Sequence, residues 1–285
     1  MGRRNAAVQA AMLAALSGLS ACAPFPATTD HGPDHAVDVS QVPDAVPTDV
    51  SPSRYGNPAS YTVLGKTYTL APACKGYHDR GIASWYGTQF HGGRTSDGET
   101  YDMYTMTAAN KVVPIPCYAR VTNLQNGRSV VVKINDRGPF VDNRLIDLSY
   151  AAASKLDMLG KGTALVDVQA VMPGEVLAPV TTAAVALPAN APVPVTLTAP
   201  AQTRPSATPQ IFLQVGAYAE RSNADAALQK LTAAGVMPAF IMPVADGART
   251  LYKVRIGPVP DVAGVDELGA RLAALGYPDA EIILP

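Results

Sequence analysis

The fold is decided by a stretch that begins GIASWYGTQFHGGRTSDGETYDM (residues 81–103) and ends VVVKINDRGPF (residues 130–140). IASWYG is typical of a strand, and the polar, glycine-rich run at 90–102 predicts a long loop. The clearest signal is CYARVTNLQNGRSVVVKIND at 117–136, where two alternating runs flank Asn126-Gly127, a pair that favours a tight hairpin. Residues 105–109 (TMTAA) predict a short turn or helix.

Short elements continue on both sides of this stretch. YTVLGKTYTL, at 61–70, predicts a strand, a turn and a second strand. Ser149 is placed to cap a helix that runs to about Leu159 and ends at Gly160, and ALVDVQAVM at 164–172 alternates like a last strand. Short strands around one small helix predict a mainly β domain over residues 61–177, a barrel rather than a doubly wound sheet.

A second domain is predicted over residues 210–285. Four strand-like runs and two amphipathic helical runs alternate there in the order βαββαβ, and Ser222 is placed to cap the first helix. This order predicts a small α+β domain with two helices on one face of a four-stranded antiparallel sheet, whose other face is open to a ligand. Residues 178–209, rich in Pro, Ala and Thr, predict a semi-extended linker between the two domains.

The N-terminus is typical of an export signal. Two arginines precede a short apolar core, and the signal ends in Leu19-Ser20-Ala21-Cys22. This ending resembles a bacterial lipobox, which implies a signal at 1–21, cleavage before Cys22 and diacylation of its sulfur. The alternative is an ordinary secretory signal with an incidental cysteine. In the lipoprotein family, alanine rather than aspartate at position 23 implies sorting to the outer membrane, which is therefore favoured over the inner one.

Residues 22–60 predict a disordered tether, because proline and aspartate are frequent there and large apolar side chains are rare. His31 and His35 fall in this segment, and a metal site on an unfolded tether is not expected. Cys74 and Cys117 have neither CxxC spacing nor a neighbouring His, so they predict either a disulfide or two separate buried thiols. The sequence therefore predicts no metal and no cofactor.

Bulk composition excludes some classes of function. The chain of 285 residues has a formal net charge of −1, which argues against a nucleic-acid partner. It also lacks 18 uninterrupted apolar residues, so a membrane-spanning helix is not expected.

Two acidic residues in the deciding stretch suit glycoside cleavage. Glu99 and Asp136 each stand beside a glycine where a strand gives way to a turn, with the aromatic residues Trp85, Tyr86 and Tyr101 in the same stretch. A carboxylic acid can protonate a leaving glycosidic oxygen while charge builds on the sugar ring. The alternative is that both acids only form turns and are solvated.

Residues 81–159 closely resemble the rare lipoprotein A family. The matching runs are GIASWYGTQFHGGRTSDGETYDMYTMTAAN and VPIPCYARVTNLQNGRSVVVKINDRGPFVDNRLIDLSYAAASKL. The resemblance implies a double-psi β-barrel and endolytic cleavage of peptidoglycan between N-acetylmuramic acid and N-acetylglucosamine. It also implies glycan stripped of stem peptides as the substrate and a 1,6-anhydro end as the product. We expect a monomer in the cell envelope, enriched at the division septum, with division-site proteins as possible partners.

The resemblance also assigns roles to residues. It implies that Asp136, in the NDRG motif, is the acid/base and that Glu99, in the DGE motif, is a second essential carboxylate. Arg137 either steadies Asp136, contacts sugar or forms a structural ion pair. The residues expected to support catalysis or to bind substrate are Trp85, Tyr86, His91, Asp102 and Asn110, with a structural role as the alternative for His91.

Asn110 departs from the family pattern, which has a histidine at this position. Asparagine cannot titrate, so it either reduces activity or serves in orientation alone. The alternative to an enzyme is therefore a non-catalytic, expansin-like peptidoglycan-binding protein.

The C-terminal domain resembles a SPOR domain through its LQVGAY and YKVRIGPV motifs. That resemblance implies binding of denuded glycan strands at the septum. The expected glycan contacts are Gln214, Ser222, Tyr252 and Arg255, with core packing as the alternative for Tyr252. An RNA-binding sheet of similar topology is disfavoured, because its aromatic motif and a basic surface are both absent.

Overall fold

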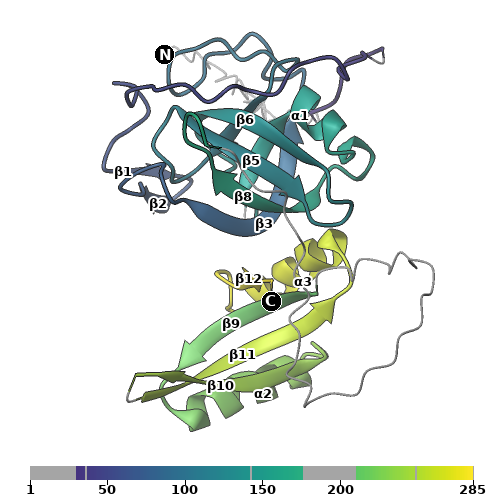
Figure 1. Ribbon diagram of the computed structural model, residues 1–285. Coiled ribbons are helices and arrows are strands. Elements are labelled where there is room, and N and C mark those ends of the chain that lie inside the picture. The colour runs from purple at the N-terminus through teal and green to yellow at the C-terminus, as the bar shows by residue number, and fades with distance from the viewer. Residues whose placement is uncertain (1–29, 36, 142, 176–209, 248, 285) are drawn as a thin grey trace, which may run out of the picture.

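The structure is a computed structural model that describes residues 30–35, 37–141, 143–175, 210–247 and 249–284. Figure 1 shows a β-barrel and, next to it, a smaller domain in which helices lie against one sheet. The predicted export signal, Cys22 and the predicted linker lie outside the described residues. None of the helices in the described ranges is long and apolar enough to cross a membrane.

The barrel is closed by six strands in the order β3-β7-β4-β6-β5-β8. Two pairs in it are parallel, β3 with β7 and β4 with β6, while the other neighbours run antiparallel. The predicted double-psi β-barrel is thus confirmed. The strand bounds are β3 His78–Tyr86, β4 Thr107–Asn110, β5 Cys117–Asn123, β6 Ser129–Asp136, β7 Ile146–Ser149 and β8 Ala164–Ala170.

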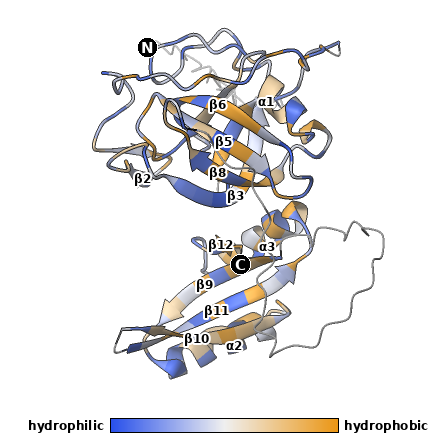
Figure 2. Cartoon of the chain, viewed as in Figure 1, coloured by the Kyte–Doolittle hydropathy of each residue, from blue (hydrophilic) through white to orange (hydrophobic). Residues whose placement is uncertain are grey.

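Alternation along the strands fills the barrel and leaves its outer face for polar groups. In β6, Val130, Val132 and Ile134 are buried in the core, while Lys133 between them is only partly buried. In β7, Ile146 and Leu148 are fully buried and Asp147 lies between them. Figure 2 shows this mixture of hydrophobic and hydrophilic colour along the barrel strands.

Two local predictions in the barrel need correction. Residues 107–110 form strand β4 instead of a turn or helix, because they pair with both β6 and β7. The helix capped by Ser149 is confirmed, and its hydroxyl accepts a hydrogen bond from the Ala152 amide. This helix, α1 (Tyr150–Lys155), ends before Leu159, and a short 3₁₀ turn (Leu159–Lys161) follows it.

Residues 30–60 are not a disordered tether along their whole length, because several of them pack on the barrel. Val39 is only 4% exposed and belongs to the barrel core. Asp44 accepts a hydrogen bond from the Val131 amide at 2.9 Å and pairs with Lys155 at 2.7 Å. A segment too polar to build a core can still be ordered when it lies on a surface that is already formed. We call residues 30–59 the strap.

The structure confirms the predicted pair of strands at 61–70 and, of the two alternatives for the cysteines, the disulfide. Strands β1 (Ser60–Val63) and β2 (Lys66–Thr69) form an antiparallel pair. Cys74 and Cys117 form a disulfide with their Cα atoms 5.8 Å apart. The disulfide fixes the loop before β3 to the start of β5.

The C-terminal domain has the predicted βαββαβ order. Its four-stranded sheet has the order β10-β11-β9-β12, all antiparallel. Ser222 does not cap the first helix, because that helix begins one residue earlier and Glu220 is its N-cap. The bounds are β9 Ile211–Tyr218, α2 Arg221–Ala233, β10 Ala239–Asp246, β11 Arg249–Val259, α3 Val262–Ala274 and β12 Glu281–Ile283.

Within the described residues, the two domains touch through two ion pairs and a few apolar side chains. Lys66 of β2 lies 3.7 Å from the Asp279 carboxylate. Arg144 of the barrel donates two hydrogen bonds to the Asp266 carboxylate of α3, at 2.8 and 2.7 Å. Ile82 and Leu165 of the barrel belong to the same apolar cluster as the core of the C-terminal domain.

Candidate active site

The site lies on the outer face of the barrel, where four neighbouring strands bring polar residues into one row. Ser84 of β3 pairs with Asp147 of β7, Asp147 pairs with Ala109 of β4, and Ala109 pairs with Asp136 of β6. The register between β4 and β6 shifts by one residue just before Ala109, so Asp136, and not Asn135, lies opposite it. Cross-strand partners lie side by side on one face. Two carboxyl groups therefore flank the small side chain of Ala109, and we call these four residues the carboxylate row.

Asp136 is held by three donors on one oxygen. Its Oδ1 accepts hydrogen bonds from the Ser96 amide (2.8 Å), the Ser96 hydroxyl (2.6 Å) and the Arg137 amide (2.7 Å). No hydrogen bond to Oδ2 occurs within the described residues. The loop at 94–100 thus fixes the orientation of the carboxyl group through Oδ1.

Glu99 comes from the same loop and is fixed by two side chains of β6. Its carboxylate forms an ion pair with Lys133 and accepts a hydrogen bond from Asn135 Nδ2 at 2.9 Å. Partial burial acts to raise the pKa of Glu99, but the bonds from Lys133 and Asn135 outweigh it and hold the pKa below its usual range. Glu99 therefore lies near the end of β6 that carries Asp136. Its lowered pKa keeps it ionised.

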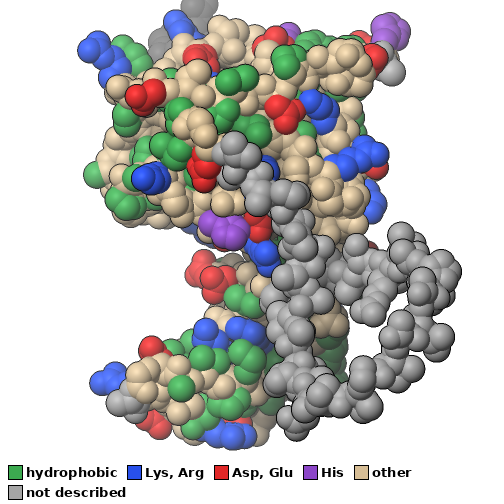
Figure 3. Space-filling view, in the orientation of Figure 1, with side chains coloured by type: hydrophobic (Ala, Val, Ile, Leu, Met, Phe, Trp, Pro, Cys, Tyr) green, Lys and Arg blue, Asp and Glu red, His purple; other side chains and the backbone are tan. Residues whose placement is uncertain are grey.

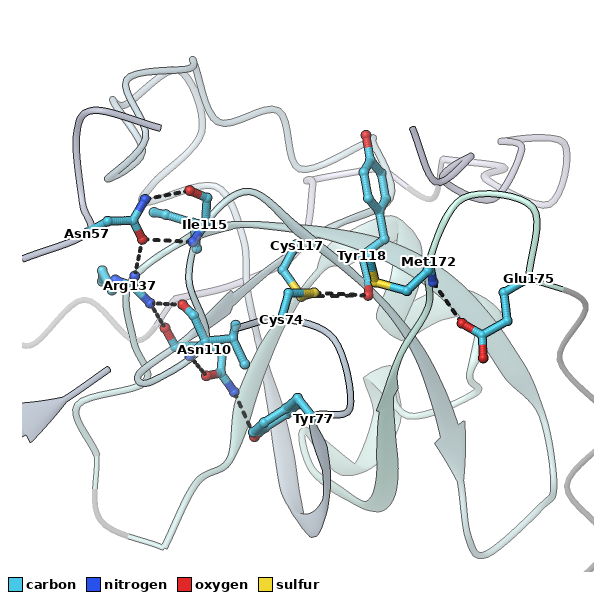
Figure 4. Close-up of a disulfide and its surroundings, with 11 residues drawn as sticks. Asn57, Cys74, Tyr77, Asn110, Ile115, Cys117, Tyr118, Arg137, Met172 and Glu175 are labelled. Carbon is cyan, nitrogen blue, oxygen red and sulfur yellow. Dashed lines mark hydrogen bonds between the residues drawn. A yellow bond between two sulfur atoms is a disulfide. The ribbon is translucent and has the colours of Figure 1, made fainter. Parts of the chain in front are cut away.

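The Arg137 side chain lies in a polar network with Asn57 and Asn110, which Figure 4 shows. Its guanidinium donates to the Gly56 and Val113 carbonyls, to the Asn110 carbonyl at 3.1 Å, and to Asn57 Oδ1 at 3.0 Å. The Arg137 guanidinium therefore forms no ion pair with Asp136, and its donors are used inside the protein instead of being presented to a sugar. The side chain joins the strap to the loop that follows β4.

Asn110 is buried within the same network, with 1% of its surface exposed. Its Oδ1 accepts from the Val112 and Val113 amides, and its Nδ2 donates to the Tyr77 hydroxyl and the Leu145 carbonyl. All four hydrogen-bonding positions of the amide are thus used inside the protein. This residue shapes the loop after β4, and its side chain has no position left for a sugar.

Tyr86 places a buried hydroxyl near the carboxylate row. Its ring stacks on Tyr101 at 4.1 Å, and the Tyr101 hydroxyl donates to the Tyr86 carbonyl. Burial, with smaller contributions from the charges of Asp136 and Asp147, raises the pKa of Tyr86. Its hydroxyl lies close to that of Thr107, yet neither makes a hydrogen bond of good geometry within the described residues.

The other predicted site residues of the barrel, Trp85, His91 and Asp102, lie at the end of β3 or in the loop that joins β3 to β4. His91 Nδ1 accepts from the Met103 amide at 3.1 Å and lies 3.7 Å from the Asp102 carboxylate. This acceptor role places the proton of a neutral His91 on Nε2. Trp85 packs edge-on against Tyr150 at 6.0 Å, partly buried against the core.

Asp147 is the member of the carboxylate row that sequence reasoning missed. The sequence IDLS contains an acidic residue within a short apolar run, and this is the signal that could have identified it. Ser84 donates a hydrogen bond to its Oδ1. Burial raises the pKa of Asp147, and the Ser84 bond and the charges of Arg144 and Lys111 only partly oppose this.

The open face of the C-terminal sheet brings two of its four predicted residues together. Gln214 and Arg255 are paired in register, and Arg255 Nε donates to Gln214 Oε1 at 3.2 Å. Ser222 is exposed on α2 instead. Tyr252 packs against the core on the helix side, where Arg221 lies over its ring at 5.9 Å, so it does not share a surface with Arg255.

No large patch of one charge marks the visible surface. On the face drawn in Figure 3, acidic and basic side chains are interspersed over the barrel. The described residues contain no group of three or more His, Cys, Asp or Glu side chains that could hold a metal. A cavity of about 720 Å³ lies beside Tyr77, His78 and Glu175, and none of its lining residues belongs to the carboxylate row.

Comparison with known proteins matches both domains. Residues 78–168 match the family model described as lytic transglycolase, and residues 207–284 match that of the SPOR domain. The endolytic peptidoglycan transglycosylase RlpA of Pseudomonas aeruginosa is 40% identical, over 87% of this chain and 83% of the relative. RlpA of Vibrio cholerae is 49% identical over 50% of this chain and 54% of the relative.

Among solved structures, the RlpA SPOR domain from Pseudomonas aeruginosa is similar to part of this chain. It is 28% identical, and the match covers 26% of this chain and 99% of that domain with a TM-score of 0.24.

Proposed function

This chain belongs to the RlpA family of endolytic peptidoglycan transglycosylases, and from that premise we propose how it cleaves glycan and where it acts. The enzyme cuts within peptidoglycan strands. The bond cut is the one between N-acetylmuramic acid and N-acetylglucosamine, in strands stripped of stem peptides. Attack by the C6 hydroxyl of the muramic acid unit leaves a 1,6-anhydro end and consumes no water.

This proposal rests on one observation, the hydrogen bonding of the two Asp136 carboxylate oxygens. Three donors fix its Oδ1, while Oδ2 has no partner within the described residues. A carboxyl group held in this way can exchange protons with a bound sugar without itself reorienting. In the simplest assignment Asp136 protonates the leaving oxygen and also receives the proton of the C6 hydroxyl.

Glu99 supports the reaction as a fixed negative charge. Its carboxylate is held by Lys133 and Asn135 at the end of β6, and its pKa lies below the usual range. A negative group near a sugar ring stabilises the positive charge that develops at the anomeric carbon. His91 and Asp102, whose side chains are partly exposed, would bind or orient the sugars.

The decisive experiment compares the wild-type protein with Asp136→Asn on amidase-treated sacculi. We expect anhydro-muramyl products from the wild type, and a loss of at least about 100-fold in the variant with glycan binding retained. A wild-type protein that binds these strands but releases no anhydro products would instead establish the non-catalytic, expansin-like alternative.

Location follows from the two ends of the chain. Cleavage before Cys22 and lipidation would attach the protein to the outer membrane, facing the periplasm. The Gln214–Arg255 face of the C-terminal domain would bind denuded strands and so concentrate the protein at the septum. There it would act as a monomer in daughter-cell separation, near division-site proteins. Septal enrichment that persists without residues 210–285 would contradict this role of the domain.

A further inference from the structure

The first residues of the strap, 30–33, are held against the loop that follows β3, and we call them the strap end. The Asp30 carboxylate accepts hydrogen bonds from the amides of Gly87, at 2.5 Å, and Gln89, at 3.1 Å. Two backbone amides of the loop thus converge on one carboxylate. We call these two amides the amide pair.

The amide pair has the chemistry of an anion site. Backbone amides that converge in a turn are an established way of binding anions. The bonds that they donate to a carboxylate are charge-assisted, and they are stronger than hydrogen bonds between neutral groups. Both donors belong to the main chain, so they remain available to another carboxylate when Asp30 leaves.

Gly87 allows the strap end to lie directly on the loop. The His31 carbonyl accepts a hydrogen bond from the Thr88 amide at 3.0 Å. A Cβ atom on residue 87 would clash with that carbonyl oxygen. The absence of a side chain at this position therefore brings the Asp30 carboxylate within reach of the amide pair.

The amide pair lies beside the carboxylate row. Ser84 of the row is three residues before Gly87, so their Cα atoms are at most about 11 Å apart. The Tyr101 hydroxyl donates to the Tyr86 carbonyl, which belongs to the same peptide group as the Gly87 amide. Burial is the largest cause of the raised pKa of Tyr101, and the negative charge of Asp30 adds to it. A glycan strand bound along the row can therefore reach the amide pair.

The strap end also covers Trp85, the single tryptophan of the chain. A Cβ atom on Gly32 would lie 3.0 Å from the Tyr150 ring and 3.9 Å from the Trp85 ring. The described residues between positions 34 and 38 are exposed, and the strap next enters the core at Val39. The strap end can thus leave the barrel while the rest of the strap stays packed.

We propose that the amide pair is the binding site for the lactyl carboxylate of an N-acetylmuramic acid unit, and that Asp30 occupies this site until glycan binds. The inference rests on the proposed function, because it takes glycan stripped of stem peptides as the substrate. A stem peptide is joined to the sugar through this carboxyl group as an amide, and its removal leaves a free carboxylate. A neutral amide oxygen can accept the same bonds, but more weakly. The amide pair therefore gives a chemical basis for the choice of stripped strands.

Trp85 fluorescence of the full-length protein tests the proposal, because no other tryptophan contributes to the signal. The ligands are short stripped strands and the same strands with each carboxylate converted to a methyl amide. The Asp136→Asn protein is used so that the strands stay intact. We expect a saturable change in emission with stripped strands, and binding at least about tenfold weaker for the amidated strands. Equal affinities for the two, or no change in emission with either, overturn the inference.

Asp30→Asn, in the same Asp136→Asn protein, tests whether Asp30 competes with glycan. Asp34→Asn is the matched control, because Asp34 is an exposed residue of the same strap and its variant changes the net charge equally. We expect Asp30→Asn to bind stripped strands at least about fivefold more tightly, since the site is no longer occupied by a charged group of the chain, and the control to bind as its parent does. An affinity within about twofold of the parent for Asp30→Asn overturns the inference.

The two proposals fail in different ways. A wild-type protein that cleaves stripped strands, and whose amide pair does not distinguish them from amidated strands, keeps the proposed function and loses the inference. A wild-type protein that releases no anhydro products loses the proposed function, whatever the fluorescence titrations show.

Discussion

Arg137 and Asn57 are separated by 80 residues in the chain, yet Nη2 of the arginine lies 3.0 Å from Oδ1 of the asparagine. Asn57 also accepts from the Ile115 amide and donates to the Ile115 carbonyl. One strap residue thus fixes the arginine that directly follows Asp136. The strap is therefore part of the structure that holds the site in place.

Asn57→Ala should destabilise the protein by about 1–3 kcal/mol, because the substitution leaves the Arg137 guanidinium and the Ile115 amide short of partners. Chemical denaturation of the purified protein measures this change. Val46→Ala is the matched control, because Val46 lies in the same strap and is 73% exposed. An unfolding free energy unchanged by Asn57→Ala would mean that the strap does not hold Arg137 in solution.

Asn110→Ala should also lower stability by about 1–3 kcal/mol, since it removes the acceptor of two backbone amides inside the protein. We expect glycan cleavage to persist at a temperature where the variant is folded, because the side chain has no free hydrogen-bonding position. Loss of cleavage in a variant as stable as the wild type would assign position 110 to the reaction instead.

Lys133→Ala should change the acid side of the cleavage-rate profile. Lys133 helps to hold the pKa of Glu99 below its usual range, so its removal raises that pKa. As the solution is acidified, Glu99 would then lose its charge at a higher pH than in the wild type. The acidic limb of the profile should therefore move to higher pH. Glu99→Gln should remove cleavage at every pH, and an active Glu99→Gln protein would exclude this carboxylate from the reaction.

Replacing both disulfide cysteines by serine should lower the unfolding free energy by about 4 kcal/mol, because the bridge closes a loop of 43 residues. Thermal unfolding of the double variant beside the oxidised and reduced wild type measures the effect. Equal melting temperatures for the two wild-type forms would show that the bridge does not contribute to stability.

Arg255→Ala should weaken binding to denuded glycan without slowing cleavage of soluble strands, because Arg255 lies in the C-terminal sheet and not in the carboxylate row. A co-sedimentation assay with denuded sacculi measures binding. Tyr252→Phe is the informative comparison, since Tyr252 packs on the helix side of the sheet and its variant should bind as the wild type does.

Local features of the sequence were sufficient for several elements. The Asn126-Gly127 hairpin joins β5 to β6 as its turn pair predicts, and Ser149 caps α1 through its own hydroxyl. Both signals act within a few residues, so they do not depend on the rest of the fold. The βαββαβ order of the C-terminal domain follows in the same way from the periodicity of each segment.

Other features depended on residues far apart in the sequence, and only the tertiary structure decided them. Residues 107–110 become a strand because β6 and β7 supply partners on both sides. The proline-rich strap is ordered because the barrel offers it a surface, and Asn110 is buried by loops that close over it.

The sequence by itself determined the family, the strand alternation and the motifs that contain Glu99 and Asp136. The tertiary structure decided that Asp147, eleven positions beyond Asp136, shares a row with it across Ala109. The physical reason is that a residue's protonation and reach depend on burial and on cross-strand neighbours, and strand pairing in a closed barrel sets both.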